Sequence, residues 1–337
     1  MSAETVGMAG ETEAGSDDRA LPFQVDALDV RGRVVTLGPA LDNILRRHEF
    51  PDPVRRLVGE ATVLASLLAT SLKDTGRFIL QAQTEGPVSM VVVDIRTPGQ
   101  IRATATFDAE AVARLEGGGG TVSSAALLGA GSLAMTVEQG PTARRYQGFV
   151  PINGETLEEA AHVYFRQSEQ IPTRIRLAVA EIFDRDSSGG PRQAWRAGGI
   201  IAQFMPESED RIRRRDLPGG DDPQRGGAAA SDDEPDDDAW VEAAILLDTV
   251  EDHELTDPDI TAERLLLRLF HERGARVFQA LSLQDHCTCS RDRIRDVLGQ
   301  MDADEIAEAS QSGDICVRCE FCGLKYAFDP AGFLPKP

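Results

Sequence analysis

The first 286 residues of this 337-residue chain contain no cysteine, and no stretch approaches 18 consecutive apolar residues. Without such a run, the sequence predicts no membrane-spanning helix. Residues 1–20 also lack the basic start and the apolar core of a signal peptide. We therefore expect a cytoplasmic protein, in whose reducing environment clustered cysteines favour metal binding or redox chemistry over structural disulfides.

Basic side chains are scarce as well. The chain has 35 Lys and Arg against 56 Asp and Glu, a formal net charge of -21, which repels phosphate backbones and anionic lipid head groups. Residues 283–337 alone contain six basic and ten acidic residues, so they lack the positive face of a nucleic-acid-binding zinc module. We expect neither a nucleic acid nor a membrane as a partner.

The motifs of common enzyme classes are missing too. The glycine cluster at residues 117–120 lacks the Gly-Lys-Ser/Thr ending of a phosphate-binding loop, so we predict a flexible loop there. No Ser-His-Asp order, carboxylate pair or dinucleotide-binding loop stands out. We predict that the protein is not an enzyme.

Composition and hydrophobic period divide the chain into segments. The N-terminal tail and the run from Ser231 to Asp238 are acidic and poor in apolar groups, so neither buries enough surface to offset its ordering entropy. Folded chain is expected to begin near Phe23. The predicted segments are a disordered tail (1–20), a β-rich core domain with helices (21–205), an acidic disordered insertion (206–238), a helical linker (239–282) and a cysteine-containing module (283–337).

Hydrophobic periodicity predicts the elements of the core and the linker. Three strand-length stretches at 77–83, 88–94 and 101–107 follow one another between short Gly-Pro and Pro-Gly turns, which favours an antiparallel meander. Further strands are predicted at 29–36, 133–137, 146–151 and 174–182, and helices at 54–72, 156–168, 239–250 and 261–271.

All five cysteines lie between residues 287 and 322. They read Cys287-Thr-Cys289, then a gap of 29 residues, then Cys319-Glu-Phe-Cys322-Gly, with the fifth at position 316. Two close pairs separated by a helix-length spacer can bring four thiolates to one ion, and soft sulfur ligands favour zinc or an iron–sulfur cluster. The sequence therefore predicts a thiol metal site formed by Cys287, Cys289, Cys319 and Cys322.

Two neighbours of these cysteines offer alternative ligands. Cys316 and Cys319 also form a Cys-x-x-Cys pair, but Gly323 directly after Cys322 lets backbone N–H groups approach the sulfur. We therefore interpret Cys316 as a spare thiol. His286 could replace one thiolate, although Cys287 beside it suits the pattern better. Four further histidines show no metal spacing with one another: His48, His162, His253 and His271.

The chain between the cysteine pairs predicts two short helices. Ser290 is a suitable N-cap for a helix over 291–298 that ends at Gly299. Asp302 and Glu305 form a capping-box pattern for a second helix through Ala309. About fifty residues rarely contain enough core to fold alone, whereas a structural zinc site contributes about 10 to 16 kcal/mol of apparent binding free energy. The metal therefore decides whether this module folds.

Several stretches together resemble a known family, the 33 kDa heat-shock proteins or 33 kDa chaperonins. Two lie in the cysteine module, His286-Cys-Thr-Cys-Ser-Arg291 and Cys319-Glu-Phe-Cys-Gly-Leu-Lys-Tyr326. Two lie upstream, Arg145-Tyr-Gln-Gly148 and Tyr164-Phe-Arg-Gln-Ser-Glu-Gln-Ile-Pro-Thr173. The likeness extends from about Phe23 to Phe328. The N-terminal tail and the acidic insertion before Trp240 depart from it.

The resemblance implies an α+β fold with a mostly antiparallel-sheet N-terminal domain, a helical linker and a small zinc-binding redox-switch domain. It also implies a stress-response chaperone: an ATP-independent holdase, inactive when reduced and bound to one Zn²⁺ per chain. Oxidative stress would then form the disulfides Cys287–Cys289 and Cys319–Cys322, release zinc and unfold the module with its linker. The activated homodimer would hold unfolded or partly folded client proteins.

The surface that would bind clients is not evident from the family motifs. The apolar stripe Leu265, Leu266, Leu269 and Phe270 of the linker is our candidate, although any packed helix shows such a stripe. Three other interpretations of the cysteines remain: a zinc site whose thiols never cycle, a thiol-disulfide oxidoreductase, and a structural zinc-ribbon adaptor. The oxidoreductase would need a thioredoxin-like βαβ setting, which the sequence around the cysteines lacks.

Overall fold

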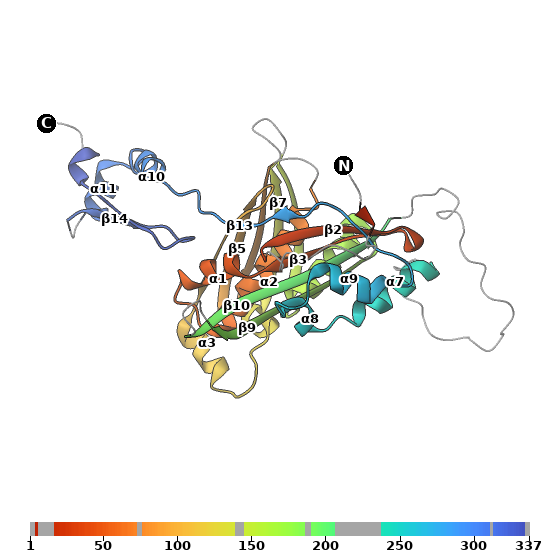
Figure 1. Ribbon diagram of the computed structural model, residues 1–337. Helices are drawn as coiled ribbons and strands as arrows, with labels where there is room; N and C mark the ends of the chain where they lie inside the picture. The colour runs from red at the N-terminus through yellow and green to blue at the C-terminus, as the bar shows by residue number, and fades with distance from the viewer. Residues whose placement is uncertain are drawn as a thin grey trace.

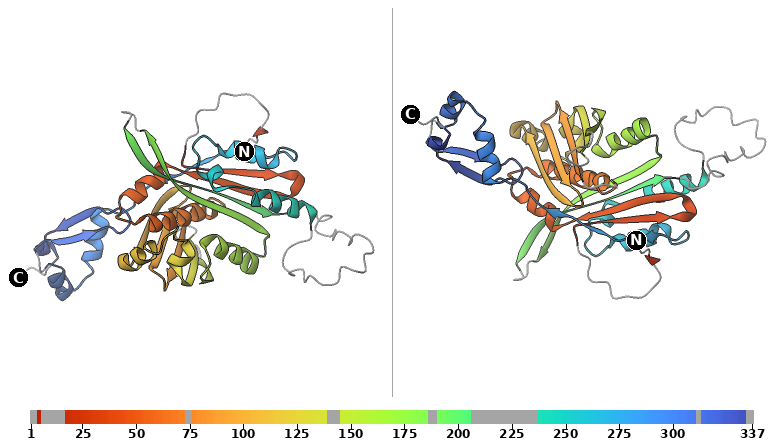
Figure 2. Two further views of the ribbon diagram at one scale, coloured as in Figure 1. Left: turned by 90° about the horizontal axis from the view of Figure 1, so that it is seen from below. Right: turned by 90° about the horizontal axis from the view of Figure 1, so that it is seen from above.

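A computed structural model describes residues 4–5, 17–72, 76–138, 145–185, 190–205, 237–310 and 313–333. Most of the predicted tail and all but two residues of the acidic insertion lie outside these ranges. The fold is α+β, as the resemblance implied, with two antiparallel sheets packed on a central helix and a C-terminal module at one end of the molecule (Figures 1 and 2). Within the described ranges, no helix is long and apolar enough to cross a membrane.

The first sheet, called sheet A here, has the strand order β1-β11-β2-β3-β10-β9, with β12 also paired to β2. Its main strands are β2 (Arg19–Val25), β3 (Val30–Leu37), β9 (Thr173–Arg185) and β10 (Pro191–Phe204), and its short ones are β1 (Glu4–Thr5), β11 (Arg276–Val277) and β12 (Leu281–Ser282). A 3-10 turn (Asp26–Leu28) joins β2 to β3.

Strand β2 begins four residues before Phe23, where folded chain was expected. Ala20, which was assigned to the tail, is fully buried, and Arg19 forms a two-bonded ion pair with Glu263 of the linker at 2.8 and 2.6 Å. The tail was therefore predicted too long at its C-terminal end, because the charged residues Asp17, Asp18 and Arg19 stand directly before the first buried residues of the strand.

The second sheet, sheet B, has the order β13-β6-β5-β4-β7-β8. Its meander β4 (Arg77–Thr84), β5 (Val88–Arg96) and β6 (Gln100–Phe107) is antiparallel, as predicted. The remaining strands are β7 (Ala130–Glu138), β8 (Arg145–Asn153) and the two-residue β13 (Gln284–Asp285), which pairs with β6 in parallel. The linker was expected to be helical to residue 282, so β11 and β12 correct that prediction, and β13 lies just beyond it.

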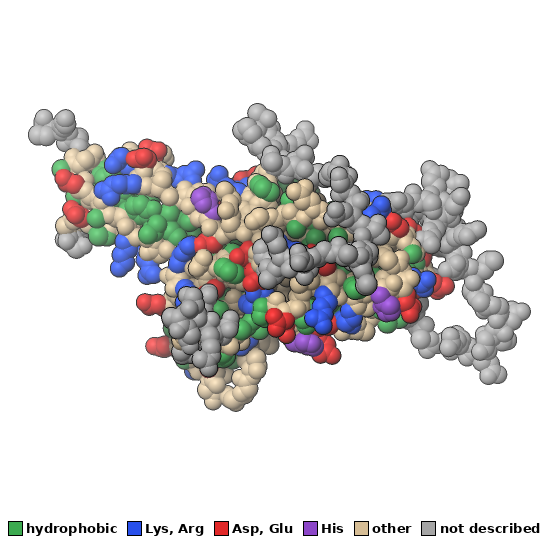
Figure 3. Space-filling model, viewed as in Figure 1, with side chains coloured by type: hydrophobic (Ala, Val, Ile, Leu, Met, Phe, Trp, Pro, Cys, Tyr) green, Lys and Arg blue, Asp and Glu red, His purple; other side chains and the backbone are tan. Residues whose placement is uncertain are grey.

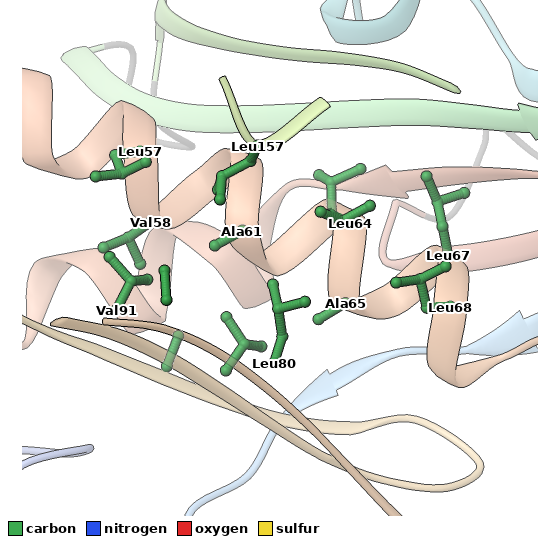
Figure 4. Packing of buried hydrophobic residues seen from close by; sticks show 14 of the residues in the cluster. Leu57, Val58, Ala61, Leu64, Ala65, Leu67, Leu68, Leu80, Val91 and Leu157 are labelled. Carbon is green, nitrogen blue, oxygen red and sulfur yellow. The ribbon is translucent and has the colours of Figure 1, made fainter. Parts of the chain in front are cut away.

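Helix α2 (Asp52–Ala69) lies between the two sheets and is the centre of the main core. Its apolar residues surround the axis instead of forming one stripe, as expected for a helix covered on all sides. In Figure 4, Leu57, Leu64 and Leu67 point to one side of the helix, and Val58 and Leu68 point to the side that carries Leu80 and Val91 of sheet B. The other helices of the core domain are α1 (Pro39–Arg46), α3 (Ala109–Glu116), α4 (Ser124–Leu128) and α5 (Leu157–Tyr164), the last continued by a π-helical turn η2 (Phe165–Glu169). The glycines at 117–120 form a turn and a bend after α3, which agrees with the predicted loop but does not test its flexibility.

The linker helices α7 (Asp238–Asp248), α8 (Asp252–Thr256) and α9 (Ala262–Phe270) cover the other face of sheet A (Figure 2). Trp240 and Phe270, both 1 % exposed, pack at ring distances of 6.0 Å from Phe204 and 5.9 Å from Phe23. A Cβ atom at Gly198 of β10 would lie 2.0 Å from the carbonyl oxygen of Leu255. Because only glycine allows this approach, α8 rests directly on the backbone of the sheet.

The C-terminal module contains the helices α10 (Arg291–Leu298) and α11 (Ala303–Ala309), as predicted. It also contains a hairpin of β14 (Ile315–Arg318) and β15 (Lys325–Phe328), followed by a 3-10 turn (Pro330–Gly332). Among the described residues of the module, four hydrophobic side chains form its buried core: Leu298, Ile306, Ile315 and Phe328. This core is separate from those of the two sheets.

Candidate metal centre

Two pieces of the module present the cysteines. Cys287 and Cys289 lie in extended chain between β13 and α10, where the Ser290 side chain caps the helix by accepting from the N–H of Arg293. Cys319 and Cys322 lie in the turn of the β14–β15 hairpin. The N–H of Gly323 donates to the carbonyl of Cys319 at 2.8 Å, with Gly323 at φ +70°, a conformation that favours glycine.

The structure brings the sulfurs of these four cysteines together. All lie within 4.8 Å of one another, with Cys287 Sγ 3.7 Å from Cys319 Sγ and Cys289 Sγ 3.3 Å from Cys322 Sγ. A tetrahedral zinc ion with Zn–S bonds of about 2.3 Å requires sulfurs about 3.8 Å apart, so the donor set and its spacing fit zinc. Among the described residues, this is the one group of three or more His, Cys, Asp and Glu side chains that could hold a metal.

The alternative ligands lie outside this cluster. Cys316 is exposed on β14, and His286 is not part of the four-sulfur group. All five cysteines are free thiols in this structure. The four-sulfur group is thus drawn from Cys287, Cys289, Cys319 and Cys322, and Cys316 is not part of it.

Burial and hydrogen bonds distinguish three of the thiols electrostatically. Burial raises the pKa of Cys287 and of Cys322, even though the N–H of Leu324 donates to the Cys322 sulfur. Burial also acts on Cys289, but the Tyr326 hydroxyl 3.2 Å away and the neighbouring thiols outweigh it and lower the pKa of Cys289. The same hydrogen bond raises the pKa of Tyr326 to about 12. Of Cys287, Cys289 and Cys322, it is thus Cys289 that most readily becomes a thiolate.

The turn that carries Cys319 and Cys322 is docked on the core domain through Phe321. The guanidinium of Arg102 on β6 lies 4.2 Å from the centre of the Phe321 ring and 4.0 Å from Cys287 Sγ. His48, just after α1, places Nε2 3.1 Å from the Phe321 carbonyl oxygen. Arg47 next to it hydrogen-bonds Asp285 of β13 at 2.7 Å.

Arg102 is in turn held by a buried carboxylate. Asp94 on β5 is 2 % exposed and accepts from Arg102 Nε at 2.8 Å and from Arg77 at 2.9 and 2.8 Å. Burial opposes ionisation of Asp94, but the two guanidinium groups outweigh it and lower the pKa of Asp94. Sequence reasoning missed these contacts, and the one visible signal was a carboxylate inside the apolar run of β5.

The linker stripe chosen as a candidate client surface is buried in this state. Leu265, Leu266, Leu269 and Phe270 are each 3 % exposed or less and pack on sheet A. Apolar surface is instead exposed on the C-terminal module, where Figure 3 shows hydrophobic side chains gathered between lysines and arginines. Val297 and Leu324, 59 % and 57 % exposed, belong to this module.

Fold and site together define an α+β protein whose C-terminal module carries a cluster of four cysteine sulfurs with the geometry to hold a metal ion. The profile of the family described as "Hsp33 protein" matches residues 18–329. A protein named 33 kDa chaperonin from Caulobacter vibrioides is 43 % identical over 317 residues, covering 94 % of this chain and 96 % of that protein. A second, from Ectopseudomonas mendocina, is 33 % identical over 321 residues, covering 94 % and 93 %. The chain belongs to the Hsp33 family of chaperones.

A solved structure shares the fold. The crystal structure of the 33 kDa chaperonin (heat shock protein 33 homolog) from Thermotoga maritima aligns with a TM-score of 0.69 at 18 % identity, covering 94 % of this chain and 96 % of that one. At this identity the likeness concerns the fold alone. It agrees with the α+β architecture described above.

Proposed function

We propose that this chain is a redox-regulated, ATP-independent holdase of the cytoplasm, silent when reduced and zinc-bound. The observation that carries the proposal is the cluster of four free thiols from two distant segments of the C-terminal module. Among the described residues of this module, four side chains form the buried core. When bound, zinc would supply much of the free energy that folds this module. Its ligands would be Cys287, Cys289, Cys319 and Cys322.

Oxidation of these thiols removes the ligands. Each pair of thiols gives two electrons and two protons to hydrogen peroxide, forming one disulfide and two molecules of water. From the family resemblance we propose the disulfides Cys287–Cys289 and Cys319–Cys322. The nearest sulfur contacts instead join Cys287 to Cys319 and Cys289 to Cys322, so disulfide mapping must distinguish the two pairings.

Covalent continuity links the module to the linker. Cys287 follows β13, and β13 is preceded by β12 and β11, so unfolding of the module frees the last strand of sheet B and then the short strands of sheet A. Loss of these strands weakens the packing of α9 on sheet A. The stripe Leu265, Leu266, Leu269 and Phe270 would then be exposed to unfolded client proteins and to a second copy of the chain in an activated homodimer.

The proposal is tested with a client protein that aggregates on heating. Protein treated with peroxide at a temperature that loosens the linker should suppress light scattering, and the reduced zinc-bound form should not. Zinc content and free thiols are counted in both samples, with four fewer thiols and no zinc expected after oxidation. Equal suppression by both forms would refute the redox switch.

A further inference from the structure

We infer that a pocket in the core domain binds client segments in which a large apolar side chain lies next to a lysine or arginine. The inference rests on the proposed chaperone function and adds a sequence preference to it. The two upstream motifs of the family resemblance, at 145–148 and 164–173, both contribute to this pocket, and neither has a role in the metal centre.

The pocket lies beyond the C-terminal end of α2, between the two sheets. Its volume is about 350 Å³, near the lower limit for ligand pockets, which suits one or two side chains better than a cofactor. The walls are mostly apolar and come from α2 and its end, both sheets and η2; the polar exceptions include Gln203 and Ser71, whose hydroxyl accepts from Arg33 at 2.8 Å. Among the apolar residues are Leu72, Phe78, Met135, Phe165 and Ile201.

One carboxylate marks the mouth of this pocket. Glu169 is exposed at the end of η2 and accepts a hydrogen bond from the Tyr164 hydroxyl at 2.7 Å. Tyr164 also hydrogen-bonds Tyr146, and burial together with these partners raises its pKa, so the hydroxyl keeps its proton. Among the described residues, no Lys, Arg or His side chain forms an ion pair with Glu169. An anion beside an apolar cavity selects a ligand that joins an apolar group to a cation.

The backbone from Phe165 to Gln170 has an unusual conformation for the end of a helix. Phe165 and Glu169 belong to a π-helical turn, a feature found often at functional sites. The turn ends at Gln170, whose φ of +54° is uncommon for a residue other than glycine. This geometry directs the Phe165 ring and the Glu169 carboxylate to the same pocket.

The surroundings of the pocket favour unfolded polypeptide as its ligand. Strand β8, the edge strand of sheet B beside β7, contributes Tyr146 to the pocket and exposes it by 54 %. A net charge of -21 complements a basic segment. No lining residue belongs to the linker or the C-terminal module, so the pocket is present in the reduced form. It would select segments weakly before oxidation adds the linker surface.

The test uses the reduced zinc-bound protein, in which the linker stripe is buried. Two labelled, unstructured peptides carry the same central leucine, flanked by lysine in one and by glutamate in the other, and their binding is measured by fluorescence anisotropy. Glu169→Gln is compared with Glu116→Gln, an equal charge change at an exposed site on α3. We expect Glu169→Gln to reduce the preference for the lysine peptide by about threefold relative to this control, as for an exposed ion pair.

A second experiment tests whether the pocket binds the apolar side chain of the peptide. Replacing the central leucine of the lysine peptide by serine should weaken binding by about tenfold or more, as expected when a leucine side chain is no longer buried. Equal peptide preferences of Glu169→Gln and Glu116→Gln would overturn the inference. Self-association of the unliganded protein that Glu169→Gln abolishes would also overturn it, by assigning the pocket to a second copy.

The two proposals fail in different ways. Aggregation assays on the oxidised forms of the same variants report on the holdase and not on the pocket. If oxidised protein suppresses aggregation while the peptide preferences are equal, the pocket inference alone fails. If the preference shift is seen but oxidised protein suppresses nothing, the redox-switched holdase fails and the peptide site stands.

Discussion

Ile306→Ala should weaken zinc binding although Ile306 is not a ligand. Ile306 on α11 is fully buried in the small core of the C-terminal module, among Leu298, Ile315 and Phe328. If the module folds only when zinc binds, every loss of folding free energy appears as a loss of metal affinity. The effect therefore measures how tightly core packing and metal binding are linked.

The expected magnitude follows from the size of this core. Replacing a buried isoleucine by alanine costs about 2 to 5 kcal/mol, and a cluster of four side chains near the surface collapses more easily than a large core. We therefore take about 2 to 3 kcal/mol, which corresponds to zinc binding weakened about 30- to 150-fold. Competition with a chromophoric zinc chelator in reducing buffer measures this ratio directly.

The matched control is Ile152→Ala. Ile152 on β8 is also fully buried, but in the main core around α2. This variant should lower the melting temperature of the core domain and leave zinc affinity unchanged. Equal zinc affinity of Ile306→Ala and the unmodified protein would show that the four thiols are held together without the module's fold, and the linkage argument would be wrong.

Three further results are expected. Cys319→Ser should lose stoichiometric zinc in reduced protein whereas Cys316→Ser keeps one ion per chain, as metal analysis would show; the reverse pattern would assign Cys316 to the site. Arg102→Ala removes the cation–π contact with Phe321, which is worth about 0.5 to 2 kcal/mol. Amide hydrogen exchange in the 319–323 turn should therefore become at least about twofold faster. An unchanged exchange rate would contradict the docking contact. Burial raises the pKa of Glu60 to about 7, so the folded protein binds one proton more than the unfolded chain between about pH 4.5 and 7, and its stability falls as pH rises through this range. Glu60→Gln should therefore reduce the dependence of the melting temperature on pH between about pH 5 and 8. An unchanged dependence would exclude Glu60 as its source.

Local sequence patterns predicted the elements whose structure depends mainly on their own residues. The helices at 291–298 and 303–309 follow from Ser290 and from the Asp302–Glu305 capping box, and both caps are present in the structure. The meander follows from its turns and alternation. The helix predicted at 54–72 corresponds to α2, whose apolar residues lie on every side because the helix is buried between the two sheets.

Local patterns did not predict the strands that form only by pairing with distant parts of the chain. Strand β10 was not predicted, because Gly198 and Gly199 weaken its strand pattern and only its neighbours β3 and β9 supply the hydrogen bonds. The hairpin β14–β15 is short and polar on its exposed side, so its period is hard to distinguish from a loop. The two-residue strands β11, β12 and β13 depend wholly on the sheet edges that they join.

The sequence by itself determined the family, the four cysteines of the cluster and the separation of a cysteine-containing module from a β-rich body, because the spacing of cysteines is a local property of the chain. Only the tertiary structure decided that Arg102 and His48 hold the Phe321 turn, that the linker stripe is buried on sheet A, and that Glu169 lies at the mouth of an apolar pocket. These contacts join residues far apart in the chain, and their energies depend on packing that no local pattern records.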